Sequence, residues 1–148
     1  MKLFGKLGCK SPKGLIMKNI IIDLDNTLTI ECTEAEGGYS KKLANVSVVD
    51  ACRKYREMGF KVIISTSRNM RTYNGNIGKI NIHTLPKIIQ WLDENEVPYD
   101  EIYVGKPWCG FEGFYVDDKA IRPSEFASMS YEEIIKLLDK ENKNSMES

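Results

Sequence analysis

Four short apolar runs, separated by stretches of helical length, constrain the fold of this chain more than any other feature of its sequence. The runs predict strands at residues 20–22, 60–65, 101–104 and 113–116. Strands that alternate with amphipathic helices are typical of a parallel sheet, whose apolar strands must be covered on both faces. The sequence therefore predicts an α/β fold with one parallel sheet and helices on both faces.

Three stretches between and after these runs have the apolar periodicity of amphipathic helices. The first can be capped by Asn45 or Ser47, the second by Thr84, and the third by a capping box that begins at Ser130. The apolar faces consist of Val48, Val49, Cys52 and Tyr55, of Leu85, Ile88, Ile89 and Leu92, and of Tyr131, Ile134, Ile135 and Leu138. Each of these faces needs a partner surface, which the predicted sheet would supply.

The composition excludes several classes of protein. The 148 residues include 21 Lys and Arg and 21 Asp and Glu, so no net charge attracts the chain to nucleic acid or to an anionic membrane. No apolar stretch approaches membrane-spanning length. The four cysteines are scattered without the spacing of a zinc site or a redox pair. We therefore expect a cytoplasmic protein with no nucleic-acid partner and no stable membrane association.

The pattern along the chain divides it into a domain and two flanking segments. We expect residues 17–139 to form the folded domain. Residues 1–16 carry four lysines and no acidic residue, and they predict a flexible basic extension, while the polar residues 140–148 predict a disordered tail. The connections 29–44 and 69–83 are candidate walls of a site, because long loops often serve as lids. No insertion is long enough to form a large cap domain.

Two carboxylates follow the first predicted strand. Asp23 and Asp25 lie two positions apart, at the end of the strand where ligands of open α/β sheets bind. A site that splits a phosphate ester needs a nucleophile, a proton donor and a divalent cation. Asp23, Asp25 and bound Mg²⁺ could supply all three. The alternative is ordinary turn chemistry, since aspartate favours turns.

The other predicted strands also end in polar groups. Thr66 follows the second strand and could hydrogen-bond a phosphoryl oxygen, or simply form a turn. Lys106 follows the third strand and could offset the charge of a transferring phosphoryl group, or lie solvated at the surface. Asp117 and Asp118 follow the fourth strand; adjacent carboxylates repel and so need a cation or a donor, unless they form a solvated turn.

Taken together, the four strand ends resemble the four motifs of the haloacid dehalogenase (HAD) superfamily of phosphohydrolases. The matching residues are Asp23-Leu24-Asp25-Asn26-Thr27, Thr66, Lys106 and Asp117-Asp118. Longer strings, among them residues 67–73, 78–86, 99–108 and 114–123, are similar to the small phosphatases of bacterial capsular polysaccharide biosynthesis. This resemblance spans about residues 17 to 138, and it implies a Rossmann-like fold of the HAD type.

The resemblance also implies a mechanism. Asp23 would attack phosphorus to form an aspartyl-phosphate, and Asp25 would act as general acid and then as general base. Thr66 and Lys106 would bind the phosphoryl oxygens. Mg²⁺ would be held by the Asp23 carboxylate, the backbone carbonyl of Asp25 and the Asp117 carboxylate, with Asp118 orienting a metal-bound water.

The implied substrate is a small phosphorylated sugar or polyol that feeds a surface polysaccharide. Arg68, Asn69, Arg71 and Lys79 are donors suited to sugar hydroxyls or to a second anion. Each of them could equally be a solvated loop residue, and Arg68 could form a structural ion pair. The rival interpretations are a phosphatase of another small metabolite such as a nucleotide, a phosphotransferase, and a non-catalytic binding module that retains the motifs.

Overall fold

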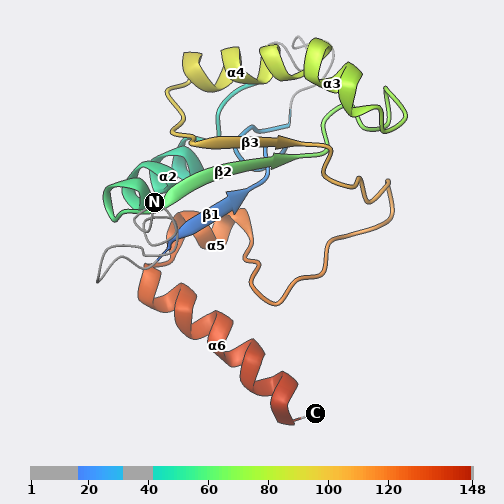
Figure 1. The fold of residues 1–148 in the computed structure, drawn as a ribbon. Coiled ribbons are helices and arrows are strands. Elements are labelled where there is room, and N and C mark those ends of the chain that lie inside the picture. The colour runs from blue at the N-terminus through green and yellow to red at the C-terminus, as the bar shows by residue number, and fades with distance from the viewer. Residues whose placement is uncertain (1–16, 32–41, 148) are drawn as a thin grey trace, which may run out of the picture.

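The computed structural model describes residues 17–31 and 42–147, and within these ranges the chain forms an α/β fold with one parallel sheet (Figure 1). The strands are β1 (Asn19–Ile22), β2 (Lys61–Thr66) and β3 (Glu101–Val104), arranged in the order β1-β2-β3. The register pairs Ile22 with Ile64 and Ile64 with Ile102. The predicted α/β class and the parallel sheet are therefore confirmed.

The helices connect the strands or follow them. Helix α2 (Val46–Glu57) joins β1 to β2, and α3 (Ile77–His83) with α4 (Leu85–Glu94) joins β2 to β3; α5 (Pro123–Ser128) and α6 (Tyr131–Glu147) follow the sheet. Both connections move across the sheet in the same direction. Because such crossovers are almost always right-handed, both place their helices over the same face.

That face holds the hydrophobic core. The side chains of Ile22, Val62 and Ile64 point into it from the sheet and are almost completely buried. They belong to one cluster with the buried residues Val48, Val49, Cys52 and Tyr55 of α2, Ile88, Trp91 and Leu92 of α4, Phe126 of α5 and Ile134 of α6. The apolar faces predicted for the three helices thus meet in a single core, except for Ile89 and Ile135, which are exposed.

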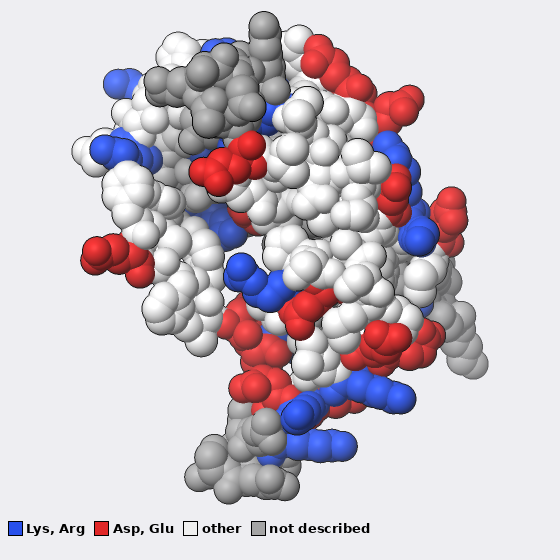
Figure 2. Space-filling model, turned by 180° about the vertical axis from the view of Figure 1, so that it is seen from behind, with Lys and Arg blue, Asp and Glu red and all other residues white. Residues whose placement is uncertain are grey.

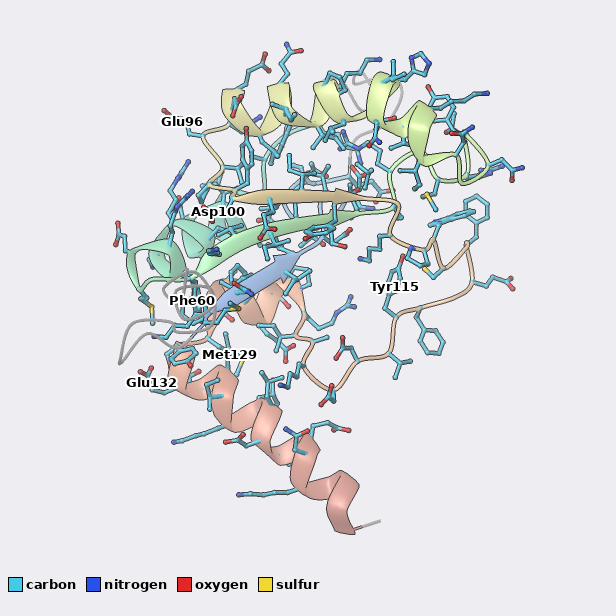
Figure 3. All side chains as sticks on the ribbon, viewed as in Figure 1. Phe60, Glu96, Asp100, Tyr115, Met129 and Glu132 are labelled. Atoms are coloured by element: carbon cyan, nitrogen blue, oxygen red, sulfur yellow. The ribbon has the colours of Figure 1, made fainter. Side chains whose placement is uncertain are left out.

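Asp100, immediately before β3, ties the sheet to α2 (Figure 3). One carboxylate oxygen accepts a hydrogen bond from the Val62 amide at 2.8 Å, and the other contacts the Arg56 guanidinium at 2.6 Å. The Asp100 amide donates in turn to the Val62 carbonyl at 2.7 Å. These bonds fix where β3 begins, and hence where its carboxyl end delivers the residues that follow it.

The second face of the sheet is open in the described part of the chain. Along each strand, the side chains of this face alternate with those that point into the core. Two of them, Ile21 and Tyr103, are 65% and 56% exposed. A groove of about 450 Å³ lies over this face and extends to Lys106. The prediction of helices on both faces is therefore wrong for these residues, because both crossovers run in one direction and cover only one side.

The predicted fourth strand at 113–116 is also absent. Residues 105–122 form an irregular segment that arches away from the sheet, and the space-filling view shows an opening beside it (Figures 1 and 2). Phe114 and Val116 are 79% and 87% exposed. The segment has strand-like residues but pairs with no strand, and an unpaired segment has no ladder of hydrogen bonds to hold it extended.

The ends of the chain differ from the prediction in one respect. Helix α6 continues to Glu147, so residues 140–147 are helical rather than a disordered tail. They contain no glycine or proline, and several are good helix formers, so nothing in the sequence stops a helix that has already begun. The predicted extension 1–16 and most of the loop 29–44 lie outside the described residues. No helix within the described ranges is long and apolar enough to cross a membrane.

The packing of α2 predicts a difference in cysteine reactivity. Cys52 is fully buried, and burial raises the pKa of its thiol to about 12, whereas Cys109 is only partly buried. Because the thiolate is the reactive form, iodoacetamide at pH 8 should label Cys109 and spare Cys52 in the folded protein. Mass spectrometry of tryptic peptides would measure this. Equal labelling of both residues without denaturant would contradict the packing of α2.

Candidate active site

Asp23 and Asp25 lie in a tight turn that begins where β1 ends. The carbonyl of Leu24 accepts hydrogen bonds from the amides three, four and five residues further on, at 3.3, 3.0 and 3.1 Å. The side chains of Leu24 and Leu28 are fully buried. Asn26 has a φ of 59°, a left-handed conformation that asparagine tolerates. Because the leucines anchor the turn in the core, the two aspartates alternate with them and remain partly accessible.

The carboxylate of Asp23, which follows β1, contacts a lysine that follows β3, the strand at the opposite edge of the sheet. Lys106 Nζ lies 3.4 Å from Asp23 Oδ1, and the Thr27 hydroxyl donates to Asp23 Oδ2 at 3.2 Å. The Asp23 side chain remains 33% exposed. A carboxylate with one cation beside it and one third of its surface accessible is arranged as an oxygen nucleophile would be.

The position of Lys106 follows from the turn after β3. The Lys106 amide donates to the Thr66 carbonyl at 3.1 Å, which extends the β2–β3 pairing by one bond. Gly105 has a φ of +84°, and a Cβ at this position would collide with the Ile77 side chain. Lys106 Nζ also lies 4.2 Å from the ring centre of Tyr115, on the arching segment (Figure 3).

Asp25 forms a second, more buried cluster. Arg68 binds it with two hydrogen bonds, Nη2 to Oδ1 at 2.6 Å and Nε to Oδ2 at 3.0 Å, and Lys42 Nζ lies 3.0 Å from Oδ1. The Arg68 and Lys42 side chains are only 3% and 9% exposed. Burial by itself would raise the pKa of Asp25, but the hydrogen bonds and charges of Arg68 and Lys42 outweigh it and hold the pKa below its ordinary value of 3.8.

These contacts match the structural alternatives for Thr66 and Arg68, while phosphoryl binding by Thr66 and substrate binding by Arg68 stay predictions. Thr66 is 1% exposed, and its hydroxyl oxygen accepts a hydrogen bond from the Arg68 amide at 3.1 Å. This geometry is the local turn that was the alternative to phosphoryl binding, although the hydroxyl hydrogen is still available to donate. Arg68 forms the structural ion pair that was the alternative to substrate binding.

The structure does not bring the other predicted substrate-binding residues to the two aspartates. Asn69, at a φ of 60°, accepts a hydrogen bond from the Thr84 hydroxyl at 2.9 Å. The Arg71 guanidinium lies 4.9 Å from the ring centre of Phe111. Lys79 lies exposed on α3. Within the described residues, none of the three has a hydrogen bond or ion pair with Asp23 or Asp25, so their role in binding stays a prediction.

Asp117 and Asp118, the two remaining predicted site residues, lie on the arching segment, and both are exposed. Asp117 accepts a hydrogen bond from the Lys119 amide at 2.9 Å. This bond holds the pKa of Asp117 below its ordinary value. Three of the four predicted strand ends therefore meet at one place, and the fourth does not.

The chemistry of the donors suits Mg²⁺, which prefers carboxylate and carbonyl oxygens, but their arrangement does not. Within the described ranges, no group of three or more histidine, cysteine, aspartate or glutamate side chains lies close enough to hold a metal ion. Asp23 contacts Lys106, Asp25 contacts Arg68 and Lys42, and Asp117 and Asp118 form no metal-binding group with them. As it stands, the arrangement does not fit the predicted magnesium site.

Sequence reasoning missed Lys42 and the hydrogen bond from Thr27. Lys42 lies at the end of a polar connection that contains several similar residues, so no local pattern distinguishes it. Ala44, two residues after Lys42, pairs with Thr29 in an antiparallel bridge. The only available signal was the position of the whole connection beside the first strand, which predicted a wall of the site but no individual residue.

A solved structure from Vibrio cholerae is similar to the chain over most of its length. It is the crystal structure of an MCSG target, with 59% sequence identity and a TM-score of 0.81, and the match covers 84% of this chain and 99% of that one. Its description names no function. No family model matches the chain, and no curated protein matches it.

The cluster around Asp25 predicts a pH-dependent contribution to stability. Asp25→Asn should lower the free energy of unfolding by about 3 kcal/mol at pH 7, because it leaves the buried Arg68 without its carboxylate. The folded pKa of Asp25 lies below 3.8, so this loss is complete above that pH and shrinks as the pH falls through the folded pKa. Urea unfolding between pH 7 and pH 3 would measure it.

Asp50→Asn is a matched control for this experiment, since Asp50 forms an exposed ion pair with Arg53 on α2. Its effect should stay below about 1 kcal/mol. If the loss in the Asp25 variant were the same at every pH, the ion pairs would not be its cause.

Proposed function

The chain belongs to the same family as this Vibrio cholerae protein, and we propose that it is a phosphomonoester hydrolase of the HAD type. The observation that carries the proposal is the meeting of polar residues at the carboxyl ends of three parallel strands: Asp23 and Asp25 after β1, Arg68 after β2 and Lys106 after β3. A partly accessible carboxylate beside a lysine and a second carboxylate provides a nucleophile, a charge partner for a phosphoryl group, and a proton carrier.

In the proposed reaction, an oxygen of Asp23 forms a bond to phosphorus while the bond from phosphorus to the leaving oxygen breaks. Asp25 gives its proton to the leaving oxygen, and it later takes a proton from the water that hydrolyses the aspartyl-phosphate. Lys106 offsets the repulsion between Asp23 and the incoming dianion. The negative charge of the substrate also raises the proton affinity of Asp25, which favours its protonated form when it is needed.

Mg²⁺ is part of the proposal, as a bound ion that would supply positive charge to the phosphoryl oxygens. The Asp23 carboxylate, the Asp25 carbonyl and the Asp117 carboxylate would hold it, with Asp118 beside them. This requires Asp117 to approach Asp23, which means that the arching segment must rearrange. We propose that residues 113–116 then pair with β1 as a fourth parallel strand and complete a Rossmann-like sheet.

Three features of the chain support this rearrangement. Among the described residues β1 pairs with β2 alone, so its other edge has unpaired backbone groups. Residues 113–116 are rich in aromatic and β-branched side chains and are exposed. The eight residues 105–112 span up to about 26 Å when extended, which exceeds the straight-line distance of about 19 Å that corresponds to three strand spacings and one strand length.

The handedness of crossovers supports it further. A connection from β3 to a strand beyond β1 moves across the sheet in the direction opposite to the other two connections. A right-handed crossover would therefore run over the open face. Trp108 and Phe111, which are 40% and 79% exposed, would then cover Ile21 and Tyr103. One rearrangement would bury two exposed apolar surfaces and complete the acidic site.

The proposed substrate is a small phosphorylated sugar or polyol of cytoplasmic surface-polysaccharide synthesis. No separate cap domain covers the site in the described residues, and the Asp23 side chain is 33% exposed, so a small phosphate ester can reach it. The polysaccharide context rests on the resemblance of the longer sequence strings to the small capsular phosphatases. A phosphatase of nucleotides, a phosphotransferase and a binding module without catalysis are alternatives that the experiments below distinguish.

The proposal predicts magnesium-dependent release of phosphate. A panel of sugar, polyol and nucleotide phosphates should show turnover that EDTA abolishes, with the sugar and polyol esters preferred. Asp23→Asn should reduce turnover by at least about a thousandfold, because the nucleophile is lost, while Asp50→Asn should retain it. Full activity of Asp23→Asn would exclude Asp23 as the nucleophile. Preference for a mononucleotide would support the nucleotide phosphatase.

The rearrangement has a test of its own that does not depend on turnover. Hydrogen exchange of the backbone amides in residues 113–116 and in β1 should slow by about tenfold or more when Mg²⁺ and inorganic phosphate are added, because strand pairing protects them. Asp117→Asn should remove most of this protection. Unchanged exchange in the wild-type protein would rule out a fourth strand that forms on metal binding.

A further inference from the structure

The two oxygens of the Asp25 carboxylate have unequal surroundings. Oδ1 accepts two hydrogen bonds, from Arg68 Nη2 at 2.6 Å and from Lys42 Nζ at 3.0 Å. Oδ2 accepts one from the described residues, from Arg68 Nε at 3.0 Å. A carboxylate oxygen has two in-plane lone pairs. Both lone pairs of Oδ1 are therefore occupied, while one of Oδ2 remains available.

Lys42 is held in place from the core. Its carbonyl accepts a hydrogen bond from Trp91 Nε1 at 2.7 Å, and Trp91 is itself 5% exposed within the core cluster. The Leu43 carbonyl accepts a hydrogen bond from the Ile30 amide at 2.9 Å. The backbone of Lys42 is thus attached both to α4 and to the chain that follows the Asp23–Asp25 turn, and its side chain is 9% exposed.

We propose, on the basis of the proposed function, that Lys42 is a positioning residue of the reaction that directs the transferred proton to Oδ2 of Asp25. Lys42 and Arg68 together occupy Oδ1, so the proton can be carried only by the oxygen with a free lone pair. In the transfer, the Oδ2–H bond breaks as the leaving oxygen gains the hydrogen and its bond to phosphorus breaks. Trp91 fixes the backbone from which Lys42 reaches Asp25.

Two other roles for Lys42 predict different kinetic effects when the lysine is removed. If Lys42 bound the substrate, its removal would raise KM and leave kcat unchanged. If its charge served only to keep Asp25 ionised, its removal would make Asp25 a better proton donor and would increase turnover of esters with poor leaving groups. Loss of positioning decreases turnover of the same esters, because a misplaced proton donor is inefficient.

The experiment compares two esters in the full-length protein with Mg²⁺. Glycerol phosphate has a poor leaving group that needs a proton, and p-nitrophenyl phosphate has a good one that needs little. Lys42→Met should lower kcat/KM for glycerol phosphate by about tenfold to a hundredfold, and for p-nitrophenyl phosphate by less than about threefold. Lys42→Arg should restore most of the loss. Lys87→Met, which removes an exposed lysine of α4, should change neither value.

Trp91→Phe tests the attachment to the core, since it keeps an aromatic ring but removes the donor to the Lys42 carbonyl. It should cause a smaller loss that is also specific to glycerol phosphate. The double variant Lys42→Met, Trp91→Phe should be no worse than Lys42→Met for this ester, because the tryptophan acts through the lysine. Thermal unfolding of each variant would show that the folded protein is being assayed.

The outcomes separate this inference from the proposed function. If the wild-type protein hydrolyses neither ester, both are overturned. If the wild type is active and Lys42→Met has unchanged or increased turnover of glycerol phosphate, or equal losses with both esters, only the role of Lys42 is overturned. A loss confined to the ester with the poor leaving group, restored by arginine, supports it.

Discussion

Two carboxylates separated by one residue repel each other, and the rest of the site exists because cations from distant parts of the chain neutralise them. Asp23 meets Lys106, which is 83 residues away in the sequence, and Asp25 meets Arg68 and Lys42, which are 43 and 17 residues away. These contacts join the turn after β1 to the ends of β2 and β3. A charged cluster of this kind is stable only if the sheet holds its members in place, so the site and the fold depend on each other.

The open face of the sheet and the arching segment have one topological cause. The order β1-β2-β3 uses two crossovers in the same direction, which leaves one face and one edge without partners among the described residues. The exposed aromatic residues between β3 and α5 match these uncovered surfaces in character. Residues 113–116 pair with no strand, and Asp117 and Asp118, which follow them, are exposed on the arching segment.

The core and the site are connected through α4. Trp91 packs within the core cluster and donates to the carbonyl of Lys42, whose side chain ends at Asp25. The packing of Trp91 in the core is thus linked, through Lys42, to the orientation of the Asp25 carboxylate. This is a physical reason for a buried tryptophan at this position, beyond the apolar area that it contributes.

The sequence by itself determined three strands, three of the helices, the parallel sheet and the place of the aspartates after the first strand. The apolar period that places Ile22 and Ile64 in strands and Ile88 and Leu92 in a helix is local information, and so is the turn that follows β1. The tertiary structure alone decided that Arg68 pairs with Asp25, that Lys42 joins them, that both crossovers cover one face, and that residues 113–116 lie apart from β1. Those outcomes depend on which distant residues meet, and a local pattern carries no information about the register and direction of such contacts.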